Sequence, residues 1–280
     1  MSSFAEKEER EFLMTDKDFD QISKMAGDLT GIVLAEHKRS MVYSRIARRV
    51  RALGFSSFRE YLTYLDANLD KESTDFINSL TTNLTSFFRE SHHFRHLKDE
   101  LLPALRFARR ESKKIRIWSA GSSTGMEAYS IAITIREAGF PSDWDIKILA
   151  TDLDSNVLDT GRAGIYSMSN SDGLEPAVLK KFFRQSKDGR SIQVKDELKN
   201  MVHFKRLNLL EGWPMKGPFD IVFCRNVVIY FNKDTQRVLF ERIANIMPDG
   251  AHLMIGHSEN LSGISGRFES LGQTIYRKVR

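Results

Sequence analysis

The chain has 280 residues, of which 41% are hydrophobic and 28% charged, with a formal net charge of +5. These values are ordinary for a globular protein, and the length allows two domains. The single cysteine, Cys224, excludes an internal disulfide and lies in an apolar run, where we expect an inert buried thiol. No apolar stretch is long enough to span a membrane, and the amino terminus is too charged for a secretory signal. We therefore expect a cytoplasmic protein without direct membrane insertion, whose positive charge suits an acidic partner.

The first part of the chain predicts helices only. Residues 1–14 show no clear apolar period and are expected to be a partly ordered lead-in. Thr15 with Asp18 three residues later predicts the start of a helix that breaks near Gly31. The pattern predicts further helices over residues 36–53, from Ser57, over 72–80 and over 91–110, the last with a kink at Pro103.

The second of these helices is strongly basic. Its apolar stripe is expected to consist of Val42, Ile46, Val50 and Leu53. No acidic residue lies between Lys38 and Arg51. The basic residues that flank the stripe are Lys38, Arg45, Arg48 and Arg49, and Arg51 lies further round the helix. A run of charges is usually a solvated face, but this one exceeds what solubility requires. It favours docking to an acidic surface.

A junction segment, TTNLTSFFRE at residues 81–90, combines two aromatic residues with polar ones. One interpretation is an interdomain hinge with Phe87 and Phe88 packed into an interface. The other is a polar arm that reaches over a ligand pocket with Asn83, Thr85 and Arg89.

Two histidines that follow the junction, His92 and His96, have a spacing that is compatible with a metal site. No third ligand lies nearby in the sequence, so we expect no metal here.

The most informative stretch is KIRIWSAGSSTGMEAY at residues 114–129. It predicts a buried strand, a loop of small residues and a helix from Gly125, the opening unit of a nucleotide-binding α/β fold. The loop lacks the lysine of a P-loop and the third glycine of a dinucleotide fingerprint. Glu127 at the helix start would repel a pyrophosphate but suits a cation. S-adenosylmethionine (SAM), with its ammonium and sulfonium groups, is the best fit.

The next strand, residues 146–150, leads into Thr151 and Asp152. A carboxylate at the end of a second strand can accept hydrogen bonds from both hydroxyls of a ribose. Asp152 after such a loop therefore strengthens the prediction of a SAM site.

The rest of the chain continues the α/β pattern with one interruption. Residues 165–201 predict a small helix and a β-hairpin inserted at the ligand edge of the sheet. Polar residues follow the strand predicted over 219–225, at the edge where ligands bind in this fold. The remaining elements are strands over 202–208 and 251–256, a helix over 233–246 and a closing hairpin formed by Phe268 and residues 274–277.

These motifs, in this order, resemble the CheR family of chemotaxis receptor glutamate O-methyltransferases. The resemblance covers residues 15–278 and rests on TTNLTSFFRE, WSAGSSTGMEAYSIA, the strand end at Asp152, FCRNVVIYF and GHSEN. It implies an α/β SAM-dependent methyltransferase (Rossmann-like) domain with a mostly parallel sheet, an all-helical amino-terminal domain and a small inserted β-subdomain. The expected bounds are 91–280, 15–90 and 165–201, respectively.

The resemblance also implies the site. The residues expected to hold SAM, and its product S-adenosylhomocysteine (SAH), are Asn83, Thr85, Arg89, Glu127, Asp152, Asn208, Leu209, Arg225 and Asn226. Two departures are Met126 and Ala128, where such enzymes usually have Glu and Pro. The turn over residues 185–190 is shorter and poorer in glycine than in members that bind a receptor's carboxyl-terminal pentapeptide. We therefore expect no such tether.

The implied reaction methylates glutamate side chains on the cytoplasmic helical bundle of methyl-accepting receptors. Arg89 and Tyr230 are the catalytic candidates, expected to orient the acceptor carboxylate. Arg45, Arg48, Arg49 and Arg51 are expected to bind the acidic receptor. Two alternatives are a nucleic-acid methyltransferase and a non-catalytic SAM-binding adaptor. Amino-methylating enzymes that act on nucleic acids usually have a motif resembling Asn/Asp-Pro-Pro-Tyr after the fourth strand. This chain has Arg-Asn-Val-Val there, so we expect no nucleic-acid partner.

Overall fold

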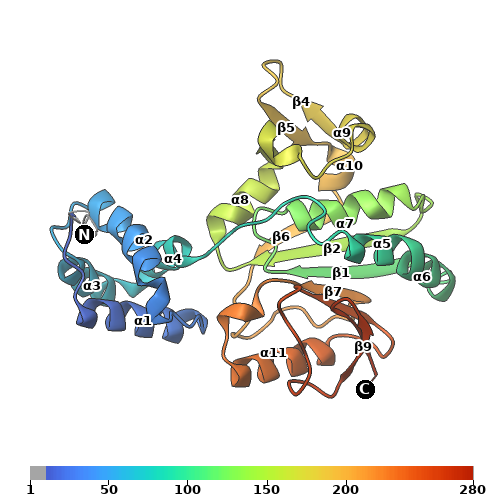
Figure 1. Cartoon of the computed structure of the whole chain (residues 1–280). Coiled ribbons are helices and arrows are strands. Elements are labelled where there is room, and N and C mark those ends of the chain that lie inside the picture. The colour runs from blue at the N-terminus through green and yellow to red at the C-terminus, as the bar shows by residue number, and fades with distance from the viewer. Residues whose placement is uncertain (1–10, 280) are drawn as a thin grey trace, which may run out of the picture. The chain divides into compact units, whose positions relative to one another are not determined.

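Two compact units make up the structure, a computed structural model that describes residues 11–279; the first unit ends at Thr81 and the second begins at Thr82 (Figure 1). Most of the lead-in predicted over residues 1–14 lies outside the described residues. This division lies before residue 90, where the prediction ended the helical domain together with its arm. The junction segment belongs to the second unit because Asn83 and Phe88 donate hydrogen bonds to Asp154 and Ser130 of that unit.

The first unit is helical, as predicted. The side chain of Thr15 accepts a hydrogen bond from the backbone of Asp18, whose carboxylate accepts one in return, and this capping box starts the first helix. Gly31, with a φ of 72°, ends that helix in the left-handed conformation. The helices are α1 (Asp16–Thr30), α2 (Arg39–Ala52, after a 3-10 turn over Glu36–Lys38), α3 (Phe58–Ala67) and α4 (Leu69–Leu80).

The apolar stripe of α2 forms much of the core of this unit. Val42, Ile46 and Val50 are fully buried, as the 3.6-residue period predicts. Leu53 was wrongly included in the stripe, since α2 ends at Ala52 and Leu53 as a whole residue is 36% exposed.

A helical segment comes first in the second unit and contributes to its core. The helix predicted over residues 91–110 is confirmed and runs without a break as α5 (His92–His96), a π-helical turn (Leu97–Leu101) and α6 (Leu102–Ala108). Pro103 closely follows the π-helical turn, which is where a proline that lacks an N–H interrupts the regular hydrogen bonding of a continuous helix. No helix within residues 11–279 is long and apolar enough to cross a membrane.

The central sheet of the second unit has the strand order β6-β2-β1-β7-β8-β10-β9 (Figure 1). The first five strands in this order are parallel, and β10 and β9 form the predicted antiparallel hairpin. Because β2 and β7 lie on opposite sides of β1, the carboxyl end of β1 is the point where ligands bind in such sheets. The strands are β1 (Lys114–Ala120), β2 (Asp145–Asp152), β6 (Val202–Arg206), β7 (Ile221–Cys224), β8 (His252–Ile255), β9 (Phe268–Gly272) and β10 (Ile275–Lys278).

Alternating side chains of the parallel strands feed two apolar cores. Ile115 and Ile117 of β1 join the core that includes α7 (Met126–Glu137), and α8 (Ser155–Ala163) contributes Leu158 to it. Trp118 and Ala120 join the core on the other face, which includes α11 (Lys233–Asn245). The strand period of two therefore explains why both faces of the sheet are covered by helices.

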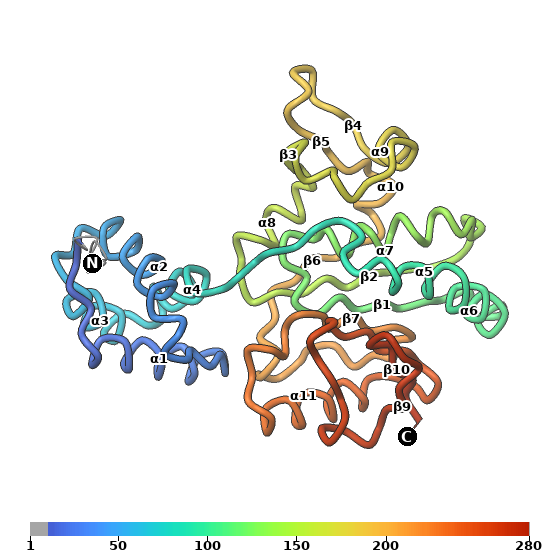
Figure 2. Tube along the Cα trace, in the orientation of Figure 1, coloured from blue at the N-terminus to red at the C-terminus, as the bar shows by residue number. Residues whose placement is uncertain are grey.

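The insert predicted over residues 165–201 forms a separate three-stranded antiparallel sheet of order β3-β5-β4, drawn in yellow tones in Figure 2. The prediction of one hairpin missed β3, which is only three residues long. Buried Phe182, Phe183 and Ile192 join the main core, so the insert is packed onto the unit. Its elements are β3 (Ile165–Ser167), a 3-10 turn (Met168–Ser171), α9 (Pro176–Phe182), β4 (Phe183–Gln185), β5 (Ser191–Val194) and α10 (Asp196–Lys199).

Candidate cofactor site

The loop of small residues after β1 is fixed by the end of β2. The backbone N–H groups of Gly121 and Ser122 both donate to the Thr151 carbonyl, at 2.8 and 2.9 Å. Gly121 has a φ of 71°, and a Cβ there would lie 2.3 Å from the Cγ2 of Val227. Only glycine therefore allows the loop to approach the turn after β7 so closely.

Asp152 lies at this loop, as predicted. Its Oδ2 accepts a hydrogen bond from the Ser123 N–H at 2.8 Å, and its Oδ1 accepts one from the Asp154 N–H at 3.0 Å. Burial raises the pKa of Asp152 despite these bonds. A carboxylate has about four acceptor sites, so these bonds leave acceptor capacity for ligand hydroxyls.

Glu127 lies in the first turn of α7 beside β1. Its Oε1 accepts a hydrogen bond from the Ser119 hydroxyl at 2.7 Å, and its Oε2 accepts one from Arg225 Nη1 at 3.0 Å. Burial raises the pKa of Glu127 above its usual value even so. The anion is thus incompletely compensated, and an additional cation would stabilise it.

Arg225, predicted to contact SAM, is surrounded by groups of the protein itself. Its side chain is 2% exposed, Nη1 binds Glu127, and Nη2 donates to the Arg89 carbonyl and lies 3.3 Å from Glu90 Oε2. The guanidinium therefore links the carboxylate of α7 to the backbone of the junction segment.

The junction segment is held within the second unit by an aromatic side chain and by polar groups. Phe87 is buried against Tyr166 and Phe183 of the insert, with ring centroids 5.3 and 5.4 Å apart. Asn83 donates to Asp154 Oδ2 at 2.8 Å, and its carbonyl accepts from the Ser123 hydroxyl at 3.0 Å. The aromatic side chain thus anchors the segment, and the polar residues run along the loop after β1.

The turn after β7 is organised by a residue whose role the sequence did not reveal. The Glu259 carboxylate accepts hydrogen bonds from the N–H groups of Asn226, Val228 and Gly256. Asn226 has a φ of 58°, which asparagine tolerates better than most residues. Tyr230 ends the 3-10 turn (Val228–Tyr230) that follows, so Glu259 fixes the backbone on which both predicted residues stand.

The two predicted residues that follow β6 are engaged locally. Asn208 follows β6 and donates to Glu211 at 3.0 Å, while its own Oδ1 accepts from the Leu210 N–H at 3.1 Å. Leu209 is buried, and its carbonyl accepts from Trp213. Thr85 is half-buried on the junction segment.

Two buried hydroxyls on the loop were also missed. Within residues 11–279, Ser122 Oγ and Thr124 Oγ1 are buried and have no hydrogen-bond partner. Buried polar atoms are normally paired, so a ligand against this loop would complete them. Together with the carboxylates of Glu127 and Asp152, they fit a ligand that carries both a cation and hydroxyl groups, as SAM does.

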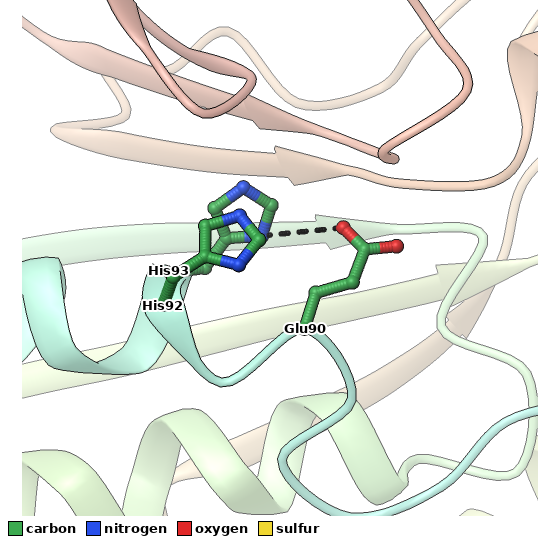
Figure 3. Close-up of side chains that lie close together, drawn as sticks. All are labelled: Glu90, His92 and His93. Atoms are coloured by element: carbon green, nitrogen blue, oxygen red, sulfur yellow. Dashed lines mark ion pairs between the residues drawn. The ribbon is translucent and has the colours of Figure 1, made fainter.

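A cluster of Glu90, His92 and His93 offers three atoms within 4.8 Å of one another that are able to bind a metal (Figure 3). However, the Arg225 guanidinium already lies 3.3 Å from Glu90 Oε2. Arg225 is thus the cation of this cluster, and a metal ion there would be repelled by it.

The four basic residues predicted to bind a partner differ sharply. Arg49 donates to Glu72 Oε2 at 2.6 Å and to Asp75 at 2.7 Å, and Arg51 pairs with Glu11. Arg45 donates to the carbonyls of Leu80 and Thr81. Arg48 is exposed and makes no hydrogen bond or ion pair within residues 11–279.

The parallel sheet and its edge carrying Glu127, Asp152 and the unpaired hydroxyls fit a SAM-dependent methyltransferase. Two family models cover most of the chain: "CheR methyltransferase, SAM binding domain" matches residues 83–277 and "CheR methyltransferase, all-alpha domain" matches residues 17–81. The chain belongs to the CheR methyltransferase family and is a SAM-dependent enzyme.

Curated relatives agree over nearly the whole length. A probable chemotaxis protein methyltransferase of Rhizobium etli is 45% identical over 88% of this chain and 94% of the relative. The chemotaxis protein methyltransferase of Salmonella typhimurium is 45% identical over 94% and 90%, respectively. Chemotaxis protein methyltransferase 2 of Pseudomonas aeruginosa is 44% identical over 95% of both chains. The resemblance inferred from the motifs is confirmed.

The raised pKa of Glu127 and Asp152 leads to a pH prediction. Protons compete with a cationic ligand for Glu127 and remove an acceptor at Asp152. The affinity for SAH should therefore fall with decreasing pH, beginning above the usual glutamate value because both groups bind protons more readily than normal. Isothermal titration calorimetry from pH 8 down to the usual glutamate pKa should show this fall and a release of protons on binding. An affinity independent of pH over this range would contradict it.

Proposed function

We propose that this enzyme transfers the methyl group of SAM to glutamate γ-carboxylates on the cytoplasmic helical bundle of chemotaxis receptors, and that it works in the cytoplasm. The observation that carries the proposal is the Arg225 bridge. It joins Glu127, our candidate for the cofactor's ammonium, to the backbone of Arg89, our candidate for the acceptor carboxylate. Names of the curated relatives support the choice of a chemotaxis substrate.

When bound, SAM supplies a sulfonium-activated methyl group. We expect Asp152 to bind the ribose and Glu127 to bind the ammonium, with the remaining contacts from Asn83, Thr85, Arg89, Asn208, Leu209, Arg225 and Asn226. The carboxylate contacts are charge-assisted and so contribute strongly to affinity.

The acceptor needs orientation more than activation. A glutamate on a receptor surface has a pKa near 4.3 and is ionised at neutral pH, so no general base is required. Arg89 and Tyr230 aim one carboxylate oxygen and exclude water from it. The negative charge of the carboxylate and the positive charge of the sulfonium cancel in the transition state. A protein group that fully neutralised the carboxylate beforehand would therefore be counterproductive.

Among the basic residues of α2, Arg48 is the best candidate for receptor binding. Arg48 is exposed and has no partner within residues 11–279, whereas Arg49 and Arg51 are engaged with acids of their own unit. Arg45 is held mainly by backbone carbonyls at the end of α4. We therefore assign docking chiefly to Arg48, with smaller shares for Arg45 and Arg51.

Replacement of Arg48 by alanine should raise the KM for receptor about threefold to tenfold at low salt, with SAM affinity unchanged. The difference should shrink as salt is added, since exposed charges are screened within about 8–10 Å at physiological ionic strength. Steady-state methylation at several salt concentrations measures this. Arg59→Ala, which removes an exposed arginine of α3, is the matched control. Equal KM values for both variants would refute the assignment.

We expect that the insert does not bind the carboxyl-terminal peptide of a receptor. The turn between β4 and β5 covers residues 186–190 and holds a single glycine, Gly189. A receptor peptide added in trans should therefore leave the KM for receptor unchanged.

The experiment that tests the proposed function is transfer of labelled methyl from SAM to a purified receptor fragment, compared with transfer to RNA. The expected product is an alkali-labile ester on receptor glutamates, located by peptide mapping. Label on RNA alone would replace the proposal with nucleic-acid methylation, and binding of SAM without turnover on any receptor would favour an adaptor.

A further inference from the structure

Glu90 is an acidic residue of the junction segment to which none of the expected roles is assigned. It follows Arg89 in the junction segment, its side chain is 10% exposed, and its two oxygens face different partners. Oε2 lies 3.3 Å from Arg225 Nη2, and Oε1 lies 3.0 Å from Nδ1 of His257. A buried acid beside a candidate catalytic residue calls for an explanation.

The charges around Arg225 do not balance. Burial alone would raise the pKa of Glu90, but the His257 hydrogen bond and the Arg225 charge outweigh it and lower the value to about 2. Burial lowers the pKa of His93 to about 3, with help from Arg225 and His92, so that histidine is neutral. Arg225 carries one positive charge and is shared between Glu90 and Glu127, which leaves one negative charge in excess when Glu127 is ionised.

The division of Arg225 between the two acids is geometrically clear. Nη1 binds Glu127 at 3.0 Å, whereas the Nη2 end lies 3.3 Å from Glu90 and donates to the Arg89 carbonyl. Without Glu90, the whole guanidinium charge would be available to Glu127. The Glu127 carboxylate would then be neutralised by the protein itself.

The backbone at this point is strained in a way that supports a functional role. Phe88 and Glu90, on either side of Arg89, have φ values of 51° and 57°, which residues other than glycine rarely adopt. The Phe88 N–H donates to Ser130 at 3.0 Å, and Arg225 holds the Arg89 carbonyl. Strain of this kind persists where surrounding contacts impose it, and it is concentrated at functional sites.

The cluster also contains polar atoms that are not yet satisfied. Among the described residues, His93 Nδ1 and Arg225 Nε are buried without a hydrogen-bond partner, and Glu90 Oε2 has the ion pair with Arg225 but no hydrogen bond. Unpaired buried polar atoms cost folding free energy. Their presence as a group therefore indicates a role beyond packing.

We propose that Glu90 is a positioning residue for the cofactor: by sharing Arg225 it leaves Glu127 with a net negative charge that accepts the ammonium group of SAM. The inference rests on the proposed function, specifically on Glu127 as the ammonium site. It explains why an arginine can lie beside the carboxylate that is expected to bind a cation.

The test compares two ligands that differ at the amino-acid end. SAH carries the ammonium and the amino-acid carboxylate, and 5′-methylthioadenosine lacks both but keeps the nucleoside. In the full chain, Glu90→Gln should weaken SAH binding about tenfold or more while changing 5′-methylthioadenosine binding less than about twofold. Decarboxylated SAH keeps the amine, so Glu90→Gln should weaken its binding by a factor similar to that for SAH. Titration calorimetry measures all three, with Glu111→Gln, an exposed acid, as the matched control.

The outcomes separate the possibilities. Equal losses for SAH and 5′-methylthioadenosine would mean that Glu90 only maintains the fold, and no loss for either would mean that it has no role; both overturn the proposal. Glu90→Asp, which keeps the charge, should recover part of the SAH affinity, and failure of both variants to fold also overturns it. If the unmodified protein binds no SAH at all, the cofactor assignment itself fails, which is a different result.

Discussion

Replacement of Asp152 by alanine is expected to reduce SAM and SAH affinity by about a hundredfold or more while the protein stays folded. The carboxylate already accepts hydrogen bonds from the Ser123 and Asp154 N–H groups, so it fixes the loop after β1 as well as offering acceptors to a ribose. Loss of two hydrogen bonds to a charged acceptor, each contributing about 1.5–3 kcal/mol, accounts for a change of this size.

Calorimetry gives the affinity in this experiment and circular dichroism gives the fold. Asp152→Asn keeps the shape and one acceptor and should lie between the alanine variant and the parent protein. Asp159→Ala, on the exposed side of α8, is the control. An Asp152→Ala protein that binds SAH within about threefold of the parent would remove Asp152 from the site.

Replacement of Arg49 by alanine is expected to destabilise the helical unit by about 3 kcal/mol or more, in contrast to Arg48→Ala. The Glu72 side chain is only 3% exposed and accepts hydrogen bonds from Arg49 and from the Tyr61 hydroxyl. Removal of one member of a buried ion pair leaves an uncompensated charge, which typically costs about 3–5 kcal/mol. A change at exposed Arg48 should stay within about 0.5 kcal/mol.

Hydrogen exchange of the full chain, read by mass spectrometry, localises this effect. Peptides from α2 and α4 should exchange faster in Arg49→Ala and at the parental rate in Arg48→Ala. Parental exchange in Arg49→Ala, combined with a loss of receptor methylation, would restore Arg49 to the partner-binding role that the sequence indicated.

The strand, loop and helix around residues 114–129 could be predicted because each depends on neighbouring residues. The period of two buries Ile115 and Ile117, glycine allows the turn, and Glu127 follows at the start of α7. Asp152 was predictable for the same reason, since the end of a strand is marked in the local sequence.

The pairings across the chain could not be predicted in this way. Arg49 and Glu72 are 23 residues apart, and nothing in the basic run indicates that one of its members is neutralised by a buried acid. Glu259 and Glu90 stand in motifs that the sequence singled out, GHSEN and TTNLTSFFRE, but their partners are fixed only by the fold. The short strand β3 was missed because three residues carry too little periodicity.

A crystal structure of the full chain with SAH tests the central claim most directly. We expect the ammonium group within hydrogen-bond distance of Glu127, the ribose hydroxyls on Asp152, and new partners for Ser122 Oγ and Thr124 Oγ1. SAH bound elsewhere, or at this edge of the sheet with its amino-acid end turned away from Glu127, would contradict the account.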